Sequence, residues 1–172
     1  MKSISSKKIV LCALFSALSV ISFLIENLFP PIIIPGAKLG VSNIFILLSV
    51  VILGGAYGYA TLIVKILFGS LFAGNISMAL YSFPAGIIAL SVEIPLIKKT
   101  KAFSLLAVSV VGSLLNLTVQ TTVFCLITKS FEYFSYLPYL ALIGAISGAI
   151  VGASVSLIIT YTHGYFNQKI YN

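Results

Sequence analysis

Long apolar segments, each ended by a short polar, glycine-rich or proline-rich interruption, follow one another along the chain. A helix needs about 20 mostly apolar residues to cross the hydrocarbon layer of a membrane, and most of these segments are close to that length. The pattern therefore predicts an all-α integral membrane protein, a compact bundle of six transmembrane helices. The six segments are 9–29, 39–53, 56–72, 76–97, 102–128 and 139–163.

The segment 39–53 is the shortest of the six. At the helical rise of about 1.5 Å per residue it covers only about 22 Å, less than the roughly 30 Å of hydrocarbon. Such a helix has to tilt, lie below one membrane surface or continue into an ordered loop. Five spans is therefore the alternative to six.

The composition separates this chain from soluble proteins. Hydrophobic residues make up 60% of its 172 residues and charged residues only 8%, whereas a soluble domain carries about 25% charged residues. We therefore expect one integral membrane domain over residues 1–172, crossing the bacterial cytoplasmic membrane several times. The first apolar segment is too long for a signal-peptide core and lacks a clear cleavage site, so we expect it to be retained.

The net charge of +7 comes from ten Lys and three Glu, with no Arg and no Asp. The lysines lie mostly at the ends of apolar segments, not along one exposed stripe, so no nucleic-acid partner is expected. Positive residues beside membrane helices favour the cytoplasmic side. With six spans and both termini in the cytoplasm, only Lys38 and Lys129 lie outside. The lysines inside are Lys2, Lys7, Lys8, Lys98, Lys99, Lys101 and Lys169.

Lys65 differs from the other lysines because it lies within an apolar segment, in the sequence TLIVKILFG. A charge at that depth in a membrane is costly and usually faces a cavity or a counter-ion. One interpretation is a cation that receives an anionic group of a ligand. The alternative is a side chain that extends to the outer lipid headgroups.

Two of the glutamates lie near the ends of apolar segments and are candidate counter-ions. Glu26, near the outer end of the first segment, is a candidate partner of Lys65 or Lys38. Glu93, near the inner end of the fourth, is expected to pair locally with Lys98 or Lys99 and not to act as a catalytic group.

Uncharged polar residues gather in the outer half of several segments. Hydrogen bonds between helices would explain each of them alone. Their common depth favours a binding site that is open to the outside. The candidate substrate-binding residues are Lys65, Lys38, Asn43, Asn75, Tyr81, Asn116 and Gln120.

The connector between the first two segments, within LFPPIIIPGAKLGVSN, contains three prolines, a Pro-Gly pair and Lys38. Proline fixes φ and removes a backbone donor, while Gly36 permits a sharp reversal. We expect residues 30–38 to form a stiff apolar lid over a cavity, with Lys38 directed inward. A loop that rests on lipid headgroups is the alternative.

Small residues spaced four apart occur in two segments. Ala13 and Ala17 share one face of the first segment, where another helix can approach closely. Internal packing and a docking surface for a separate membrane subunit both fit this pair. In the last segment, Gly144, Gly148 and Gly152 repeat the GxxxG pattern, which indicates close packing inside the bundle or against a partner.

The sequence lacks the groups that many catalytic and cofactor sites need. Without Asp there is no aspartate-rich motif for Mg²⁺ and a diphosphate, and without Arg there is no bidentate phosphate clamp. There is no GxxxxGK[ST] motif for ATP. His163 is the single histidine, and Cys12 and Cys125 lie far apart in apolar segments. We expect no metal, no cofactor and no enzymatic activity of this chain alone.

The stretches PGAKLGVSNI and VKILFGSLFAGNISMALYSFPAGIIALSVE resemble a membrane family named heptaprenyl diphosphate synthase component I, also called the Gx transporter family. That family is similar in architecture to the substrate-binding S components of energy-coupling factor transporters. The resemblance implies six helices that capture a vitamin or related micronutrient from outside, under the first outer loop. It also implies docking through Ala13 and Ala17 onto a transmembrane T component that is driven by two ATPase subunits.

We therefore predict a membrane substrate-binding subunit that captures a small anionic or amphipathic micronutrient. The alternative is a non-catalytic membrane subunit of a polyprenyl diphosphate synthase, as the family label implies. A third hypothesis is a scaffold that transports nothing and is held by its glycine and alanine faces. Co-purifying partners distinguish the three, because the first predicts ATPases, the second a prenyl synthase and the third neither.

Overall fold

A computed structural model of the chain describes residues 6–28, 40–98 and 104–166. These residues are helical apart from short turns, and no strand occurs among them. The expectation of an all-α fold is therefore confirmed. The elements are α1 (Ser6–Leu28), α2 (Val41–Leu53), α3 (Gly55–Phe72), α4 (Ser77–Lys98), α5 (Leu105–Thr128), the 3₁₀-helix η1 (Phe131–Tyr136) and α6 (Leu137–Phe166).

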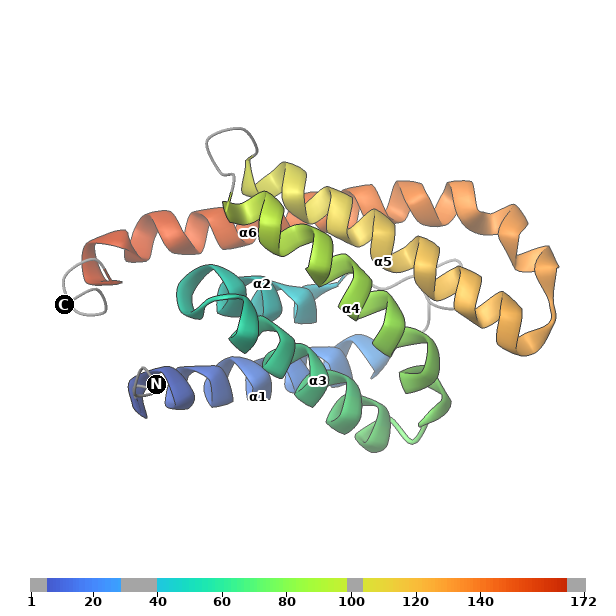
Figure 1. Ribbon diagram of the computed structural model, residues 1–172, viewed down its shortest axis with the longest axis horizontal. Helices are drawn as coiled ribbons and strands as arrows, with labels where there is room; N and C mark the ends of the chain where they lie inside the picture. Colours follow the sequence, from blue (N-terminus) through green and yellow to red (C-terminus); the bar gives the residue numbers. More distant parts are fainter. Residues whose placement is uncertain (1–5, 29–39, 99–103, 167–172) are drawn as a thin grey trace.

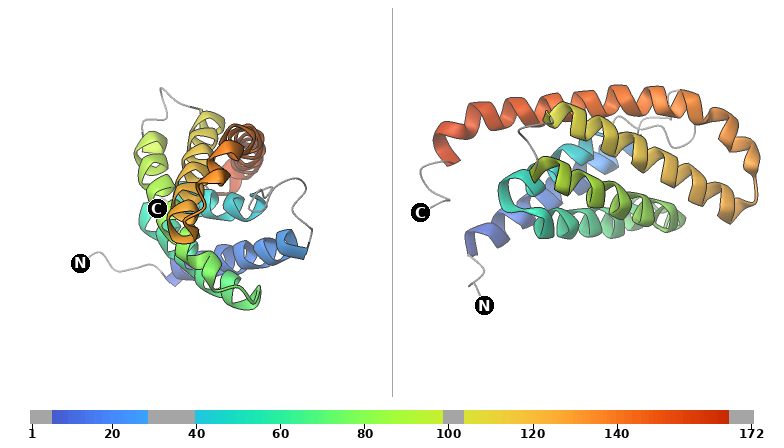
Figure 2. Two further views of the ribbon diagram at one scale, coloured as in Figure 1. Left: turned by 90° about the vertical axis from the view of Figure 1, so that its right-hand side faces the viewer. Right: turned by 45° about the horizontal axis from the view of Figure 1, so that its top comes forward.

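Successive α-helices run in opposite directions, so α1 begins and α6 ends at the same end of the bundle (Figure 1). We call this the terminal end, and we call the other end, which holds the α3–α4 turn and η1, the distal end. Helices that are neighbours in the chain pack together, and α2 also contacts α6. The two further views show α5 and α6 lying side by side along much of their length (Figure 2).

Five of the helices, α1, α3, α4, α5 and α6, are long and apolar enough to cross a membrane. The fold is therefore that of a multi-pass membrane protein. Their bounds lie within three residues of the predicted segments. The second helix, α2, has only 13 residues and a length of about 20 Å. A sixth full span and the cytoplasmic position of both termini remain predictions.

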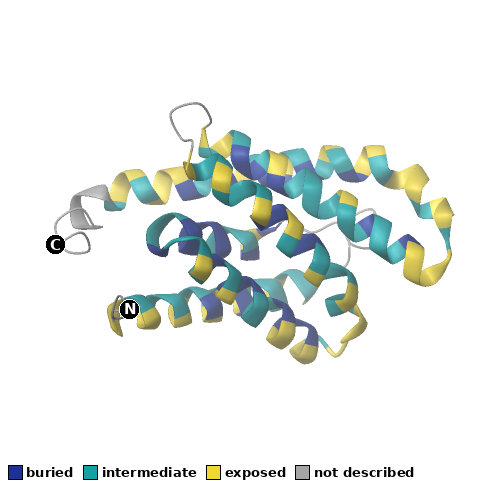
Figure 3. Cartoon of the chain, viewed as in Figure 1, coloured by how far each residue is buried: buried dark blue, intermediate teal, exposed yellow. Residues whose placement is uncertain are grey.

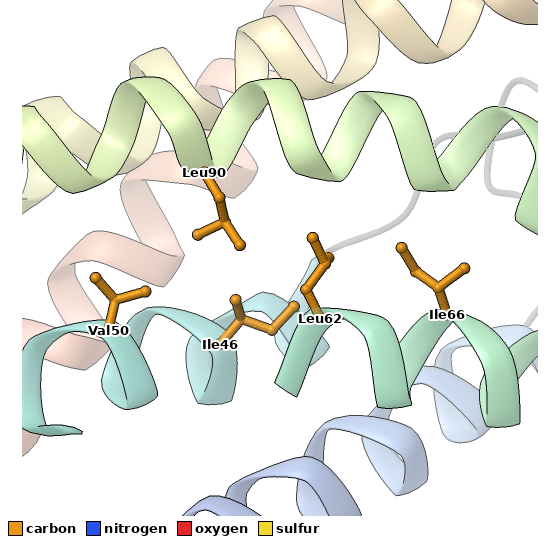
Figure 4. Close-up of a cluster of buried hydrophobic side chains, with 5 residues drawn as sticks. All are labelled: Ile46, Val50, Leu62, Ile66 and Leu90. Carbon is orange, nitrogen blue, oxygen red and sulfur yellow. The ribbon is translucent and has the colours of Figure 1, made fainter. Parts of the chain in front are cut away.

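The short helix α2 occupies the centre of the bundle and has the largest buried share of any helix (Figure 3). One apolar cluster joins it to α3 and α4 (Figure 4), and a second joins it to α6. Surrounded on several sides, α2 is apolar on nearly all its faces, as expected for a fully buried helix. The first cluster is Ile46, Val50, Leu62, Ile66 and Leu90, and the second is Leu47, Leu48, Val151 and Val155.

Glycines in α6 allow this helix to pack closely against α5. A Cβ at Gly148 would lie 2.7 Å from the carbonyl oxygen of Ser109, and one at Gly152 would lie 2.6 Å from Cα of Leu106. These neighbours are backbone atoms that cannot rotate away. Of the two interpretations of the GxxxG pattern, the structure supports packing inside the bundle.

The alanine pair of α1 lies on the outside of the bundle. Ala13 and Ala17 are exposed, as are the neighbouring apolar residues Leu14 and Ile21. In the described part of the chain this apolar face is exposed, so it is available to a lipid bilayer or to a partner helix. The exposure of the pair favours the docking interpretation over internal packing, and docking itself remains a prediction.

Candidate functional site

The ammonium of Lys65 is directed toward α2. Its Nζ donates a hydrogen bond of 2.6 Å to Oδ1 of Asn43, in the first turn of that helix. The same nitrogen lies 5.7 Å from the centre of the Phe23 ring on α1, within the range of a cation–π contact. The side chain is half-buried. Lys65 thus places its charge where α1, α2 and α3 meet.

A cavity of about 90 Å³ adjoins this lysine in the distal half of the bundle. All six α-helices contribute a polar residue to its lining, while Phe23, Leu62, Ile66 and Leu117 are among its apolar residues. Such a site combines apolar walls with a few polar groups, as small-molecule sites do. The polar and charged lining residues are Glu26, Ser42, Asn43, Lys65, Ser70, Ser82, Ser113, Asn116, Gln120 and Ser147.

Glu26 secures the start of α2 at the edge of this cavity. Its carboxylate accepts a hydrogen bond of 2.6 Å from the backbone N–H of Val41 and one of 3.2 Å from the hydroxyl of Ser42. The first N–H groups of a helix have no partner within that helix, and a negative charge is favourable there. Glu26 therefore joins α1 to α2 and helps to fix the position of Asn43.

Gly40 provides the sharp turn that precedes α2. Its φ of 70° lies in the left-handed region, which glycine adopts without strain. A Cβ there would lie 2.7 Å from Oγ of Ser147, so α2 begins close against α6. This close approach brings Ser42 and Asn43 to the same cavity as the α6 serine.

The cavity brings together Lys65, Asn43, Asn116 and Gln120, four of the residues proposed from the sequence for one site. Their positions agree with that hypothesis, while binding by them remains a proposal. Lys38 and the expected lid at 30–38 lie outside the described residues.

Asn75 and Tyr81 were expected at the same site, but the structure places them elsewhere. Asn75 is exposed in the turn between α3 and α4. Tyr81 packs its ring edge-on against Phe124, with 5.6 Å between the ring centres. Adjacent helix residues point about 100° apart, so Ser82 faces the cavity while Tyr81 faces α5.

Several lining residues are serines that the sequence did not single out. The sequence spacing could have identified Ser113, because it shares a helix face with Asn116 and Gln120 at positions i, i+3 and i+7. No such spacing identifies Ser147, because it lies among the glycines and alanines of α6. Their place in the cavity lining becomes evident only when the neighbouring helices are arranged around them.

A smaller cavity of about 40 Å³ adjoins the first toward the terminal end. The two share the lining residues Asn43, Leu62, Gly86, Ser113 and Asn116. The lining of the smaller cavity also includes two polar residues that the larger one lacks. They are Glu93 from α4 and Ser109 from α5.

Glu93 was expected to pair with Lys98 or Lys99, but its side chain points across to α5. A Cβ added to Gly112 would overlap its carboxylate. Lys98 is exposed, and no ion pair links it to Glu93 in the described part of the chain; Lys99 lies outside that part. The pairing with Lys98 is therefore wrong, because Glu93 occupies the helix face that packs against the glycine of α5.

A family model described as heptaprenyl diphosphate synthase component I matches residues 15–158 of the chain. The matched region includes every described residue that lines the two cavities. Neither the curated proteins nor the solved structures include a significant match.

Proposed function

The chain belongs to the heptaprenyl diphosphate synthase component I family, and we propose that it is the substrate-binding membrane subunit of an energy-coupling factor type transporter. The main support is the larger cavity, to which all six α-helices contribute polar side chains. A bundle built only for scaffolding has no need for such convergence, because buried polar groups in a membrane are costly.

The chemistry of the cavity favours a small solute with an anionic group. Lys65 supplies the positive charge, and the amides of Asn43, Asn116 and Gln120 supply donors and acceptors. The apolar walls accept the rest of the solute, so it is anionic or amphipathic. The ammonium of Lys65 already donates a hydrogen bond to Asn43. This bond positions the ammonium before a ligand arrives.

The partners that we propose are a transmembrane T component and two ATPase subunits. The exposed face of α1 around Ala13 and Ala17 is a surface on which a partner helix can pack closely. The chain itself has no P-loop sequence, so ATP would have to be used by another subunit. The proposed location is the bacterial cytoplasmic membrane, with the distal end facing outward.

Replacing the cavity lysine tests the proposed site. Native mass spectrometry of gently purified wild-type protein should reveal a retained small molecule of anionic character. We expect Lys65→Met to lower its retention about tenfold or more, because one charge-assisted contact is lost. Lys98→Met, which removes an exposed lysine at the terminal end of α4, serves as the matched control. Equal retention by both variants would contradict a role for the Lys65 charge.

A second candidate is a non-catalytic membrane subunit of a polyprenyl diphosphate synthase, favoured by the description of the family. It predicts a soluble, aspartate-rich catalytic partner and no tightly held solute. Affinity purification from native membranes separates the two proposals. Recovery of ATPases supports the transporter, and recovery of a prenyl synthase supports the second candidate.

A further inference from the structure

The proposed capture of an anionic solute leaves one ionisable group inside the bundle, half-buried, without a role. Glu93 lies on α4 and lines the smaller cavity. Position 112 of α5 is a glycine, and a Cβ there would overlap the carboxylate oxygen Oε1 of Glu93. Glycine at this position therefore leaves the space that the acidic side chain occupies inside the bundle.

Within the described residues, Glu93 has neither a hydrogen-bond donor nor a cation as its partner. The other helices present only uncharged side chains around the smaller cavity. Polar neighbours are Ser109, Ser113 and Asn116 from α5 and Asn43 from α2, and the apolar ones include Val151 of α6. An ionisable group within a membrane is expensive and marks a functional site by default. The carboxylate form of this side chain is stabilised by a positive charge, which the described lining of the smaller cavity does not supply.

The two charged groups face parts of one polar hollow. Lys65 lines the larger cavity and Glu93 the smaller one, and both cavities include Asn43, Ser113 and Asn116. Glu93 lies over Gly112 of α5. Asn116 is four residues further along α5, about 6 Å nearer the distal end. The larger cavity also includes Glu26, whose carboxylate is engaged by Val41 and Ser42 at the start of α2. Lys65 is therefore the cationic group of the distal part of the hollow, and Glu93 is the acidic group of its terminal part.

We propose that the solute is bipolar, with an anionic group that binds Lys65 and a cationic nitrogen that binds Glu93. This inference rests on the proposed function and narrows its substrate class to small molecules that carry both charges. A solute with both groups neutralises both ends of the hollow at once. A solute with only an acidic group leaves the carboxylate of Glu93 inside the bundle without a cationic partner, which is unfavourable.

Matched probes on one carbon skeleton test this proposal in purified wild-type protein. The bipolar probes are γ-aminobutyrate and ε-aminocaproate, the acid-only probes are butyrate and caproate, and the amine-only probes are butylamine and hexylamine. Binding is followed by titration calorimetry and by the shift of the thermal unfolding midpoint. We expect at least one bipolar probe to bind about tenfold or more tightly than its acid-only and amine-only counterparts.

Two variants then assign this preference to Glu93. Glu93→Gln should reduce the affinity for the bipolar probe to that of the acid-only probe, and should leave the acid-only affinity unchanged. Gly112→Ala should act in the same direction, because it displaces the carboxylate without removing its charge. Ser109→Ala, which alters an uncharged residue of the same cavity, should retain the preference. Gel filtration and unfolding midpoints establish that each variant is folded.

The remaining outcomes overturn the inference, and they distinguish it from the proposed function. A bipolar preference that survives Glu93→Gln overturns it, because glutamine has the shape of a permanently protonated carboxyl group. Acid-only binding that depends on Lys65, without any bipolar preference, overturns the inference and leaves the proposed function standing. Failure of all probes to bind, or equal binding of all of them, counts against both.

Discussion

At the residue scale, Asn43 connects the parts of the candidate site. Its Oδ1 accepts the hydrogen bond from Lys65, and its side chain lines both cavities. The residue is held in place from the α1 side, where Glu26 accepts hydrogen bonds from Val41 and Ser42. A carboxylate on one helix thereby determines where an amide on the next helix meets the lysine.

Removing the charge of Glu26 should loosen the start of α2. Glu26→Gln keeps the size of the side chain, but it weakens the hydrogen bond from the Val41 N–H and the interaction with the helix dipole. We expect the protein to lose about 1 kcal/mol of stability, measured as a lower midpoint of thermal unfolding in detergent. Glu132→Gln, an exposed glutamate in η1, is the control. Equal midpoints in the two variants would show that Glu26 does not anchor the helix.

The sequence identifies some site residues and misses others for a physical reason. Lys65 stands out because an ammonium within an apolar span is rare and costly. Serine is common in membrane helices, where its hydroxyl can bond to the backbone of its own helix, so Ser113 and Ser147 look ordinary. Tyr81 and Ser82 are both polar and adjacent, and only the rotation of α4 decides which one faces the cavity. A single sequence does not fix that rotation.

At the element scale, α2 shows how glycines determine the length of a buried helix. Gly40 precedes it with a φ of 70° and Gly54 follows it with a φ of 108°, both conformations that other residues rarely adopt. The sequence predicted a short second helix, and its hydrophobicity agrees with burial. Its contact with α6 could not be predicted, because the hydrophobic clusters join residues about one hundred positions apart.

Filling the contact between α5 and α6 should destabilise the bundle. Gly148→Val places a branched side chain where Cβ alone would lie 2.7 Å from the backbone of Ser109 and Val110. Backbone cannot move aside as a flexible side chain can, so we expect a loss of about 3 kcal/mol, the upper part of the range for overpacking.

The matched control for this substitution is Ser156→Val, which adds similar bulk at an exposed position of the same helix. The measurement is the unfolding midpoint in detergent, together with elution in gel filtration. An unchanged midpoint in Gly148→Val would show that the helices separate readily and that α5–α6 packing does not hold the bundle.

At the scale of the whole molecule, the proposed function depends on the orientation of the bundle. The order and approximate bounds of the helices followed from hydropathy, because a membrane span has a required length. The position of the cavity did not follow, because it arises from the convergence of all six α-helices. The orientation in the membrane rests on the distribution of lysines alone.

Labelling of single cysteines tests this orientation. In a background without Cys12 and Cys125, Lys129→Cys marks the distal end, after α5, and Lys98→Cys marks the terminal end of α4. Because Lys7, Lys8 and Lys98 lie at the terminal end, we expect a membrane-impermeant maleimide added to intact cells to label the Lys129→Cys variant only. Both variants should react after permeabilisation, which establishes that each thiol is accessible. The reverse pattern would turn the distal half, with Lys65 and its cavity, toward the cytoplasm, where the protein could not capture a solute from outside.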